Sequence, residues 1–109
     1  MTERRTVLIT GGSRGIGAAC AETFARKGYQ VILTYRTQQG KAEKVIESLE
    51  GNGHKIYPLH LDDYVAIERQ ISLILSEVTH IDVLVNNAGI FMEHAIDKVS
   101  YEEWLRRGR

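Results

Sequence analysis

The sequence predicts an α/β fold in which a parallel β-sheet is covered by helices on both faces. Four apolar runs bounded by turn residues alternate with stretches of helical periodicity along the 109 residues. Three of the runs are continuous in Val, Ile and Leu, which is typical of strands buried on both faces. Because the connections are short, this alternation favours right-handed βαβ units within one domain.

The four apolar runs define the expected strands. They are Thr6–Thr10 (TVLIT), Gln30–Tyr35 (QVILTY), His54–His60 (HKIYPLH) and Ile81–Asn86 (IDVLVN). Each run is bounded by residues that form turns. The segments between them are therefore expected to be helical crossovers.

The first expected helix runs from about Gly15 to Lys27. Ile16, Cys20 and Phe24 recur at spacing i, i+4, i+8, which predicts an apolar ridge, and Gly28 is in position to end the helix. Cys20 is then interpreted as a small apolar side chain on the buried face of this helix rather than a nucleophile.

Two further helices and the start of a fourth are expected. The second expected helix has an apolar face made of Ala42, Val45, Ile46 and Leu49. It ends in the turn Gly51-Asn52-Gly53. The third carries Ile67, Ile71, Ile74 and Val78, with Asp62 or Asp63 as its N-cap. A fourth helix is expected to begin at Ser100, because Ser100 and Glu103 have capping-box spacing and Trp104 follows as an apolar anchor.

Composition argues against several classes of function. The 14 Lys and Arg residues balance the 14 Asp and Glu residues, so nothing favours nucleic acid or an anionic membrane as a partner. The four histidines lack the spacing of a zinc site and the single cysteine adds no ligand, so no metal site is predicted. The lone cysteine fits a reducing compartment, and no run suits a signal peptide or membrane span. We therefore expect a cytoplasmic protein.

A glycine-rich segment, VLITGGSRGIG, joins the first strand to the first helix. Its pattern is T-G-x3-G-x-G, carried by Thr10, Gly11, Gly15 and Gly17, and it is neither G-x-G-x-x-G nor a P-loop. A strand, a glycine loop and a helix in succession present unpaired N–H groups and the positive end of a helix dipole to an anion. The segment predicts a phosphate-binding turn, and an ordinary tight turn is the alternative.

A second motif, Asn86-Asn87-Ala88-Gly89, follows the fourth strand. Together, at this separation, the two motifs resemble those of the short-chain dehydrogenase/reductases, over essentially the whole chain. Within that family, GGSRGIG and the TYR-T stretch are most similar to reductases of 3-oxoacyl thioesters. The resemblance implies a Rossmann-type doubly wound sheet of strand order 3-2-1-4, truncated before strand 5. Residues 1–109 would then be an NAD(P)-binding domain that is incomplete at its C-terminus.

The resemblance also implies cofactor-binding roles for residues of both motifs. Those expected to line the phosphates and the adenosine ribose are Gly11, Gly12, Ser13, Arg14 and Ile16. The other two glycines of the motif, Gly15 and Gly17, are also expected to belong to the cofactor site. The cofactor is expected to pass beside Asn87, Ala88 and Gly89, while Asn86 ties neighbouring strands together. After the third strand, His60 and Leu61 stand where the family usually has Asp and then Val or Leu beside the adenine. A neutral imidazole offers one acceptor instead of two carboxylate oxygens, so the adenine contact is expected to be weaker.

The end of the second strand predicts NADP(H) rather than NAD(H). An NAD site usually holds the ribose 2′-hydroxyl with an Asp or Glu about 20 residues past the first glycine. That region here reads Tyr35-Arg36-Thr37, without a carboxylate. Arg36 and Arg14 are expected to flank a 2′-phosphate, and the alternative is that Arg36 is a solvated charge at a strand end.

Catalytic residues are not expected within these 109 residues. The family uses a tyrosine as acid and base, assisted by a lysine four residues later, a serine and an asparagine, because tyrosine alone has a pKa of about 10. The residues four places after the five tyrosines are Leu33, Gln39, Leu61, Glu68 and Leu105. The sequence therefore predicts the NADP(H)-binding portion of an oxidoreductase, inactive alone. A non-catalytic dinucleotide-binding module or an interaction module is the alternative.

The fourth strand carries a further expectation. Without a fifth strand beside it, the run IDVLVN leaves an apolar edge, which predicts marginal stability, self-association or pairing with a complementing chain.

Overall fold

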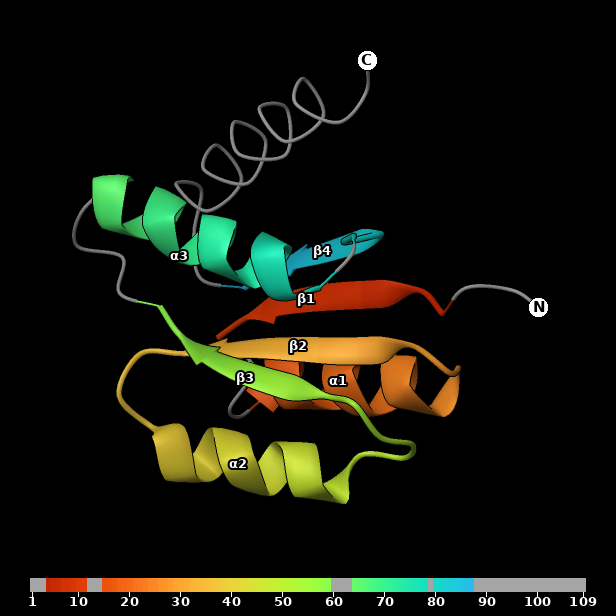
Figure 1. Cartoon of the computed structure of the whole chain (residues 1–109). Helices are drawn as coiled ribbons and strands as arrows, with labels where there is room; N and C mark the ends of the chain where they lie inside the picture. Colours follow the sequence, from red (N-terminus) through yellow and green to blue (C-terminus); the bar gives the residue numbers. More distant parts are fainter. Residues whose placement is uncertain (1–3, 12–14, 60–63, 79, 88–109) are drawn as a thin grey trace, which may run out of the picture.

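The computed structural model describes residues 4–11, 15–59, 64–78 and 80–87 (Figure 1). Along the chain these residues form β1 (Thr6–Thr10), α1 (Gly15–Arg26), β2 (Gln30–Tyr35), α2 (Gln39–Ser48), β3 (Lys55–Pro58), α3 (Tyr64–Glu77) and β4 (Val83–Asn86). The strands form one parallel sheet in the order β3-β2-β1-β4. The predicted α/β fold and its strand order are confirmed.

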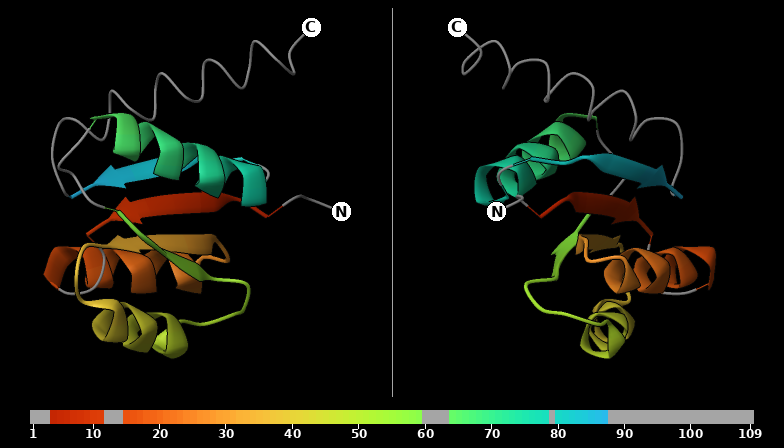
Figure 2. Two further views of the ribbon diagram at one scale, coloured as in Figure 1. Left: turned by 60° about the vertical axis from the view of Figure 1, so that its left-hand side comes forward. Right: turned by 90° about the vertical axis from the view of Figure 1, so that its right-hand side faces the viewer.

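Helices cover both faces of the sheet (Figure 2). α1 and α2 lie on one face and α3 lies on the other. β1 is buried along its whole length, and its side chains alternate between two cores: Val7 and Ile9 pack with α1, while Leu8 packs with α3. Because the central strands are apolar on both faces, they read as continuous runs in the sequence.

The second and third expected helices pack against the sheet with the residues that their periodicity predicts. On α3, Ile67, Ile71 and Ile74 are at most 1% exposed. On α2, Ala42 is fully buried, and Leu49 caps the helix and is buried as well. These helices therefore cover the sheet through the faces that the sequence indicates.

α1 buries a different ridge from the predicted one. Its buried residues are Gly17, Ala21 and Ala25, one position beyond the predicted ridge. Cys20 packs at the margin of the core, but Ile16 is 74% exposed at the first turn. Small side chains allow the axis of α1 to approach the sheet closely. The size of the residues therefore decides which face of α1 is buried.

Gly28 ends α1 as predicted. It has φ 90°, its N–H donates to the carbonyl of Ala25 at 3.0 Å, and the N–H of Tyr29 donates to the carbonyl of Phe24 at 3.1 Å. This is a Schellman motif, and the rings of Phe24 and Tyr29 supply its apolar contact, edge to face, with centroids 4.9 Å apart.

β3 is shorter than the predicted strand His54–His60. At its amino end the side chain of His54 replaces the backbone ladder, because Nδ1 of the ring accepts the N–H of Val31 at 2.9 Å. Nε2 of the same ring contacts the carbonyl of Glu50 at 2.7 Å, so the neutral imidazole carries its proton on Nε2. The turn before it has two glycines at positive φ, Gly51 and Gly53, as the sequence indicates.

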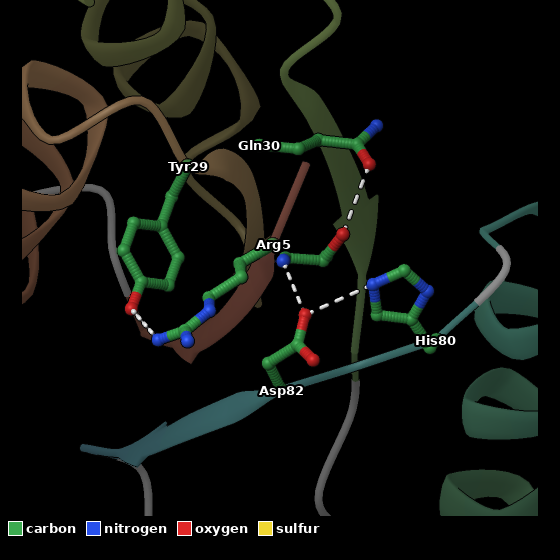
Figure 3. Close-up of polar contacts among 6 residues, drawn as sticks. Arg5, Tyr29, Gln30, His80 and Asp82 are labelled. Atoms are coloured by element: carbon green, nitrogen blue, oxygen red, sulfur yellow. Dashed lines mark hydrogen bonds and ion pairs between the residues drawn. The ribbon is translucent and has the colours of Figure 1, made fainter. Parts of the chain in front are cut away.

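β4 also begins later than the predicted Ile81, because the carboxylate of Asp82 takes the place of a backbone acceptor. It accepts the N–H of Thr6 at 2.7 Å and contacts Nε2 of His80 at 3.0 Å (Figure 3). Oγ1 of Thr6 in turn donates to the side-chain oxygen of Gln30 at 3.2 Å. Side chains thus link β4, β1 and β2 at their amino ends.

Some expectations lie outside the described residues. They are the N-cap at Asp62 or Asp63 and the helix beginning at Ser100. Among the helices that the structure describes, none is long and apolar enough to span a membrane.

Candidate functional site at the carboxyl ends of β1 and β4

The carboxyl ends of β1 and β4 lie side by side at the point where the order of the strands reverses. From β1 the chain proceeds outward to β2 and β3, and β4 returns on the other side of β1 (Figure 1). Thr10 and Asn86, the last residues of these two strands, are paired in register. A reversal of strand order of this kind leaves a crevice at the carboxyl ends, and open α/β sheets bind their ligands there.

Gly11, the first glycine after β1, is held by both neighbouring strands. Its N–H donates to Oγ1 of Thr34 on β2 at 3.2 Å, and its carbonyl accepts from Nδ2 of Asn87, which follows β4, at 3.3 Å. Gly11 has φ 68°, a left-handed conformation that residues with side chains rarely adopt. An added Cβ would lie 3.7 Å from the nearest atom, so the backbone conformation, and not a lack of space, requires glycine.

Thr10 joins β1 to β4 at the same level. Its side chain is fully buried, and Oγ1 accepts the N–H of Asn87 at 2.9 Å. The same hydroxyl lies 3.4 Å from Oδ1 of Asn86, to which it can donate. The strand-linking role expected of Asn86 is confirmed. The glycine turn therefore begins at a residue, Thr10, that is hydrogen-bonded to the end of β4.

α1 begins four residues after Gly11, at the same edge of the sheet. Gly15 opens the helix with φ 62°, and no acidic side chain lies in the first turn. The first N–H groups of an α-helix have no partner within the helix, and they carry the positive end of its dipole. The exposed side chain of Ile16 adds an apolar surface at this turn. Such an end of a helix is suited to a phosphate group.

Arg36 is exposed and directly follows β2, the strand that pairs with β1. The segment from Tyr35 to Gln39 contains no carboxylate. Arg36 therefore adds a positive charge at the carboxyl end of β2, and a guanidinium is a group that binds phosphate.

The structure brings six predicted residues to this edge of the sheet: Gly11, Gly15, Ile16, Gly17, Arg36 and Asn87. The other predicted residues lie outside the described part of the chain: Gly12, Ser13, Arg14, His60, Leu61, Ala88 and Gly89. The sequence reasoning missed Thr34. The available signal was a hydroxyl at the carboxyl end of an otherwise apolar run, beside the strand that leads into the glycine turn.

The most strongly perturbed ionisable group among the described residues lies away from this edge. Tyr57 on β3 is buried against α3, and that burial, followed by a hydrogen bond to Glu77, raises its pKa above the ordinary value. Tyr57 is therefore protonated at neutral pH and has a structural role. Within the described ranges, His, Cys, Asp and Glu residues do not gather in groups of three or more that could hold a metal ion.

Residues 5–107 match the family model of the short chain dehydrogenases. The chain belongs to this family. It is 39% identical over 102 residues to the 3-oxoacyl-[acyl-carrier-protein] reductase FabG of Escherichia coli strain K12, an alignment that covers 94% of this chain and 41% of the relative. The chain thus spans about two fifths of the length of the curated relatives that it matches.

Solved structures of short-chain dehydrogenases share the fold. A short chain dehydrogenase from Bacillus anthracis superposes with a TM-score of 0.73 at 25% identity, over 95% of this chain and 51% of the other. A metagenomic short-chain oxidoreductase in complex with NADP superposes with a TM-score of 0.67 at 33% identity, over 79% of this chain and 39% of the other. The predicted family and its Rossmann-type sheet are therefore confirmed for this short-chain dehydrogenase chain.

Proposed function

We propose that the chain is the NADP(H)-binding part of an oxidoreductase that transfers hydride between NADPH and a carbonyl or alcohol group. The observation that carries the proposal is the turn between β1 and α1. There Gly11 is clamped in a left-handed conformation, and α1 begins without an acidic side chain. Family membership and a similar structure that was solved with NADP support it. The reductase named among the relatives makes 3-oxoacyl thioesters the first substrates to assay.

We propose a role for each of the predicted residues in holding one part of the cofactor. The amides from Gly12 to Gly17 would hold the pyrophosphate, with Ser13 and Arg14 beside the ribose. His60 and Leu61 would lie near the adenine, and Asn87, Ala88 and Gly89 would lie along the cofactor. Arg36 and Arg14 would hold the 2′-phosphate, and when bound the cofactor supplies the hydride at its nicotinamide ring.

Within these 109 residues we assign no catalytic side chain. None of the five tyrosines is followed by a lysine at the fourth position, so we propose that residues 1–109 form one NAD(P)-binding domain that binds cofactor without turnover. The single cysteine fits a reducing compartment, and we place the protein in the cytoplasm.

Cofactor titration tests the proposal. We expect this chain to bind NADPH at least about tenfold more tightly than NADH in calorimetry, because one hydrogen bond to a charged group contributes about 1.5 to 3 kcal/mol. Arg36→Gln should weaken NADPH binding by that factor and leave NADH binding unchanged. Arg26→Gln, at the far end of α1, is the control and should alter neither affinity. Equal affinities of the unmodified chain for both cofactors would contradict the choice of NADP(H).

We also propose that β4 pairs with a second copy of this chain. Among the described strands β4 pairs only with β1, and Val83, Leu84, Val85 and Asn86 are only partly buried. Strand edges of this kind recruit other strands. We expect the sedimentation coefficient to rise with protein concentration. A single monomeric species over the whole range would refute this pairing.

A further inference from the structure

We propose that Thr34 is a positioning residue for the dinucleotide, acting through the backbone of Gly11. The inference rests on the proposed cofactor-binding function and adds to it a residue that lies on a different strand from the glycine motif. Thr34 is the next-to-last residue of β2, is 2% exposed, and its Oγ1 accepts the Gly11 N–H at 3.2 Å.

Packing alone does not require a hydroxyl at this position. The neighbouring residues of β2 are Val31, Ile32 and Leu33, all fully buried, and valine has nearly the same shape as threonine. A buried hydroxyl or a buried N–H without a partner destabilises a protein. The hydrogen bond between the Thr34 hydroxyl and the Gly11 N–H gives each group the partner that it needs. The hydroxyl of Thr34 is therefore matched to the turn after β1.

The hydrogen bond between Thr34 and Gly11 determines which backbone N–H groups are available to a ligand. Because the Gly11 N–H faces β2, it is not a phosphate donor, and its carbonyl is likewise engaged by Asn87. Gly11 thus contributes conformation and no hydrogen bond to the cofactor. Under the proposed function the phosphate donors include the first N–H groups of α1, which begins at Gly15, and the path of the chain into α1 starts from the conformation of Gly11.

Loss of the hydrogen bond between Thr34 and Gly11 would lower cofactor affinity, because fewer molecules would hold the turn in the conformation that binds. A turn released from β2 adopts other conformations, and apparent affinity falls in proportion to the fraction of molecules that keep the competent one. The pyrophosphate is common to NADPH and NADH, so both cofactors should be affected equally. This separates Thr34 from Arg36, whose expected contact is with the 2′-phosphate alone.

The test compares Thr34→Val, Thr34→Ser and Arg36→Gln in the full 109-residue chain. Thr34→Val should weaken NADPH and NADH binding by the same factor, about tenfold, since the Gly11 N–H loses its acceptor. Thr34→Ser restores the acceptor and should restore both affinities. Amide exchange by NMR should show the Gly11 N–H protected in the unmodified chain and in Thr34→Ser, and unprotected in Thr34→Val.

Thr6→Val is the matched control. Thr6 is also a buried strand threonine, 3% exposed, but it lies at the amino end of β1. This change should lower stability and leave both dissociation constants unchanged. An equal loss of affinity in Thr6→Val would assign the effect of Thr34→Val to general destabilisation and overturn the proposal.

The remaining outcomes are also decisive. Unchanged affinity in Thr34→Val would overturn the role of Thr34 alone, whereas failure of the unmodified chain to bind either cofactor would overturn the proposed function and this role together. If Thr34→Val does not fold, Thr34→Cys takes its place, because a thiol is a weak acceptor of similar size. Affinity in Thr34→Cys equal to that of the unmodified chain would then refute the proposal.

Discussion

Three buried threonines, Thr6, Thr10 and Thr34, each place a hydroxyl where a central strand begins or ends. Each hydroxyl bonds to a group on a neighbouring strand or turn. Valine would fill the same space, but a backbone N–H left without a partner costs about 1 to 3 kcal/mol. At the scale of single residues, the hydroxyls of Thr10 and Thr34 therefore accept backbone N–H groups that the strand ladder leaves without a partner, and the hydroxyl of Thr6 bonds to the side chain of Gln30.

Tyr57 links the sheet to α3 through a hydrogen bond between two side chains. Its ring is 7% exposed, and its hydroxyl donates to the carboxylate of Glu77. Burial, and then this hydrogen bond, raises the pKa of Tyr57 above the usual value of about 10. The folded state holds this proton more tightly than the unfolded chain does. The contribution of Tyr57 to stability is therefore complete below about pH 10 and is lost as the pH rises above it.

The corresponding variant is Tyr57→Phe. We expect it to lower the free energy of unfolding at pH 7 by about 1 kcal/mol, because the hydrogen bond to Glu77 is lost. Its stability should also decline less steeply above pH 10 in urea unfolding. Tyr35→Phe, at a half-buried tyrosine, is the control. Parallel pH profiles for Tyr57→Phe and the unmodified chain would contradict the argument.

At the scale of elements, the end of α1 depends on a conformation that only glycine adopts easily. Gly28 has φ 90°, whereas Gly40 lies inside α2 with ordinary helical geometry and nothing within 4 Å of an added Cβ. We expect Gly28→Ala to lower the midpoint of urea unfolding, at a cost of about 1 kcal/mol. Gly40→Ala, in the first turn of α2, should raise the midpoint, because alanine favours a helix more than glycine does. Shifts of the same sign would show that backbone conformation does not decide the two effects.

The carboxylate of Asp82 helps to attach the amino end of β4 to β1, in addition to the backbone pairing of the two strands. Asp82 accepts the N–H of Thr6, and removing that acceptor leaves a strand amide without a partner. Asp82→Ala should lower the free energy of unfolding by about 1 to 3 kcal/mol, and Asp82→Asn, which keeps an oxygen acceptor, should lower it less. Glu47→Ala, at an exposed position of α2, is the control in the same urea titration. Equal losses in the two Asp82 variants would show that the acceptor is not what matters.

At the scale of the whole molecule, the alternation of strands and helices was enough to predict a parallel sheet covered on both faces, whereas the strand order 3-2-1-4 came from the resemblance to the short-chain dehydrogenase/reductases. Continuous apolar runs such as Val31–Leu33 can only be buried on both faces, and that requires helices above and below. The ridge of α1 was predicted wrongly at Ile16, because periodicity weighs hydrophobicity while close contact with the sheet selects small residues.

The candidate site shows a similar limit. The glycine spacing predicts a turn at Gly11, but the partners of Gly11 are distant along the chain. Thr34 is 23 residues away and Asn87 is 76 residues away. Only the pairing of β1 with β2 and β4 brings them to one point. A single sequence signals the conformation of the turn through its own residues, and the groups that hold it there are a property of the assembled sheet.

The outer side of β3 has a consequence for how copies of the molecule can assemble. The N–H of Leu59 faces β2, where it donates to Tyr35, so the preceding position, Pro58, faces outward and has no N–H to give. Within β3 as described, the N–H of Ile56 is the donor that faces outward, so the outer side of β3 offers few hydrogen-bond donors to another strand. If two molecules associate through β4, each uses the one outer strand of the described sheet that readily accepts another strand. Such an assembly closes as a two-fold symmetric pair and does not extend into a fibre.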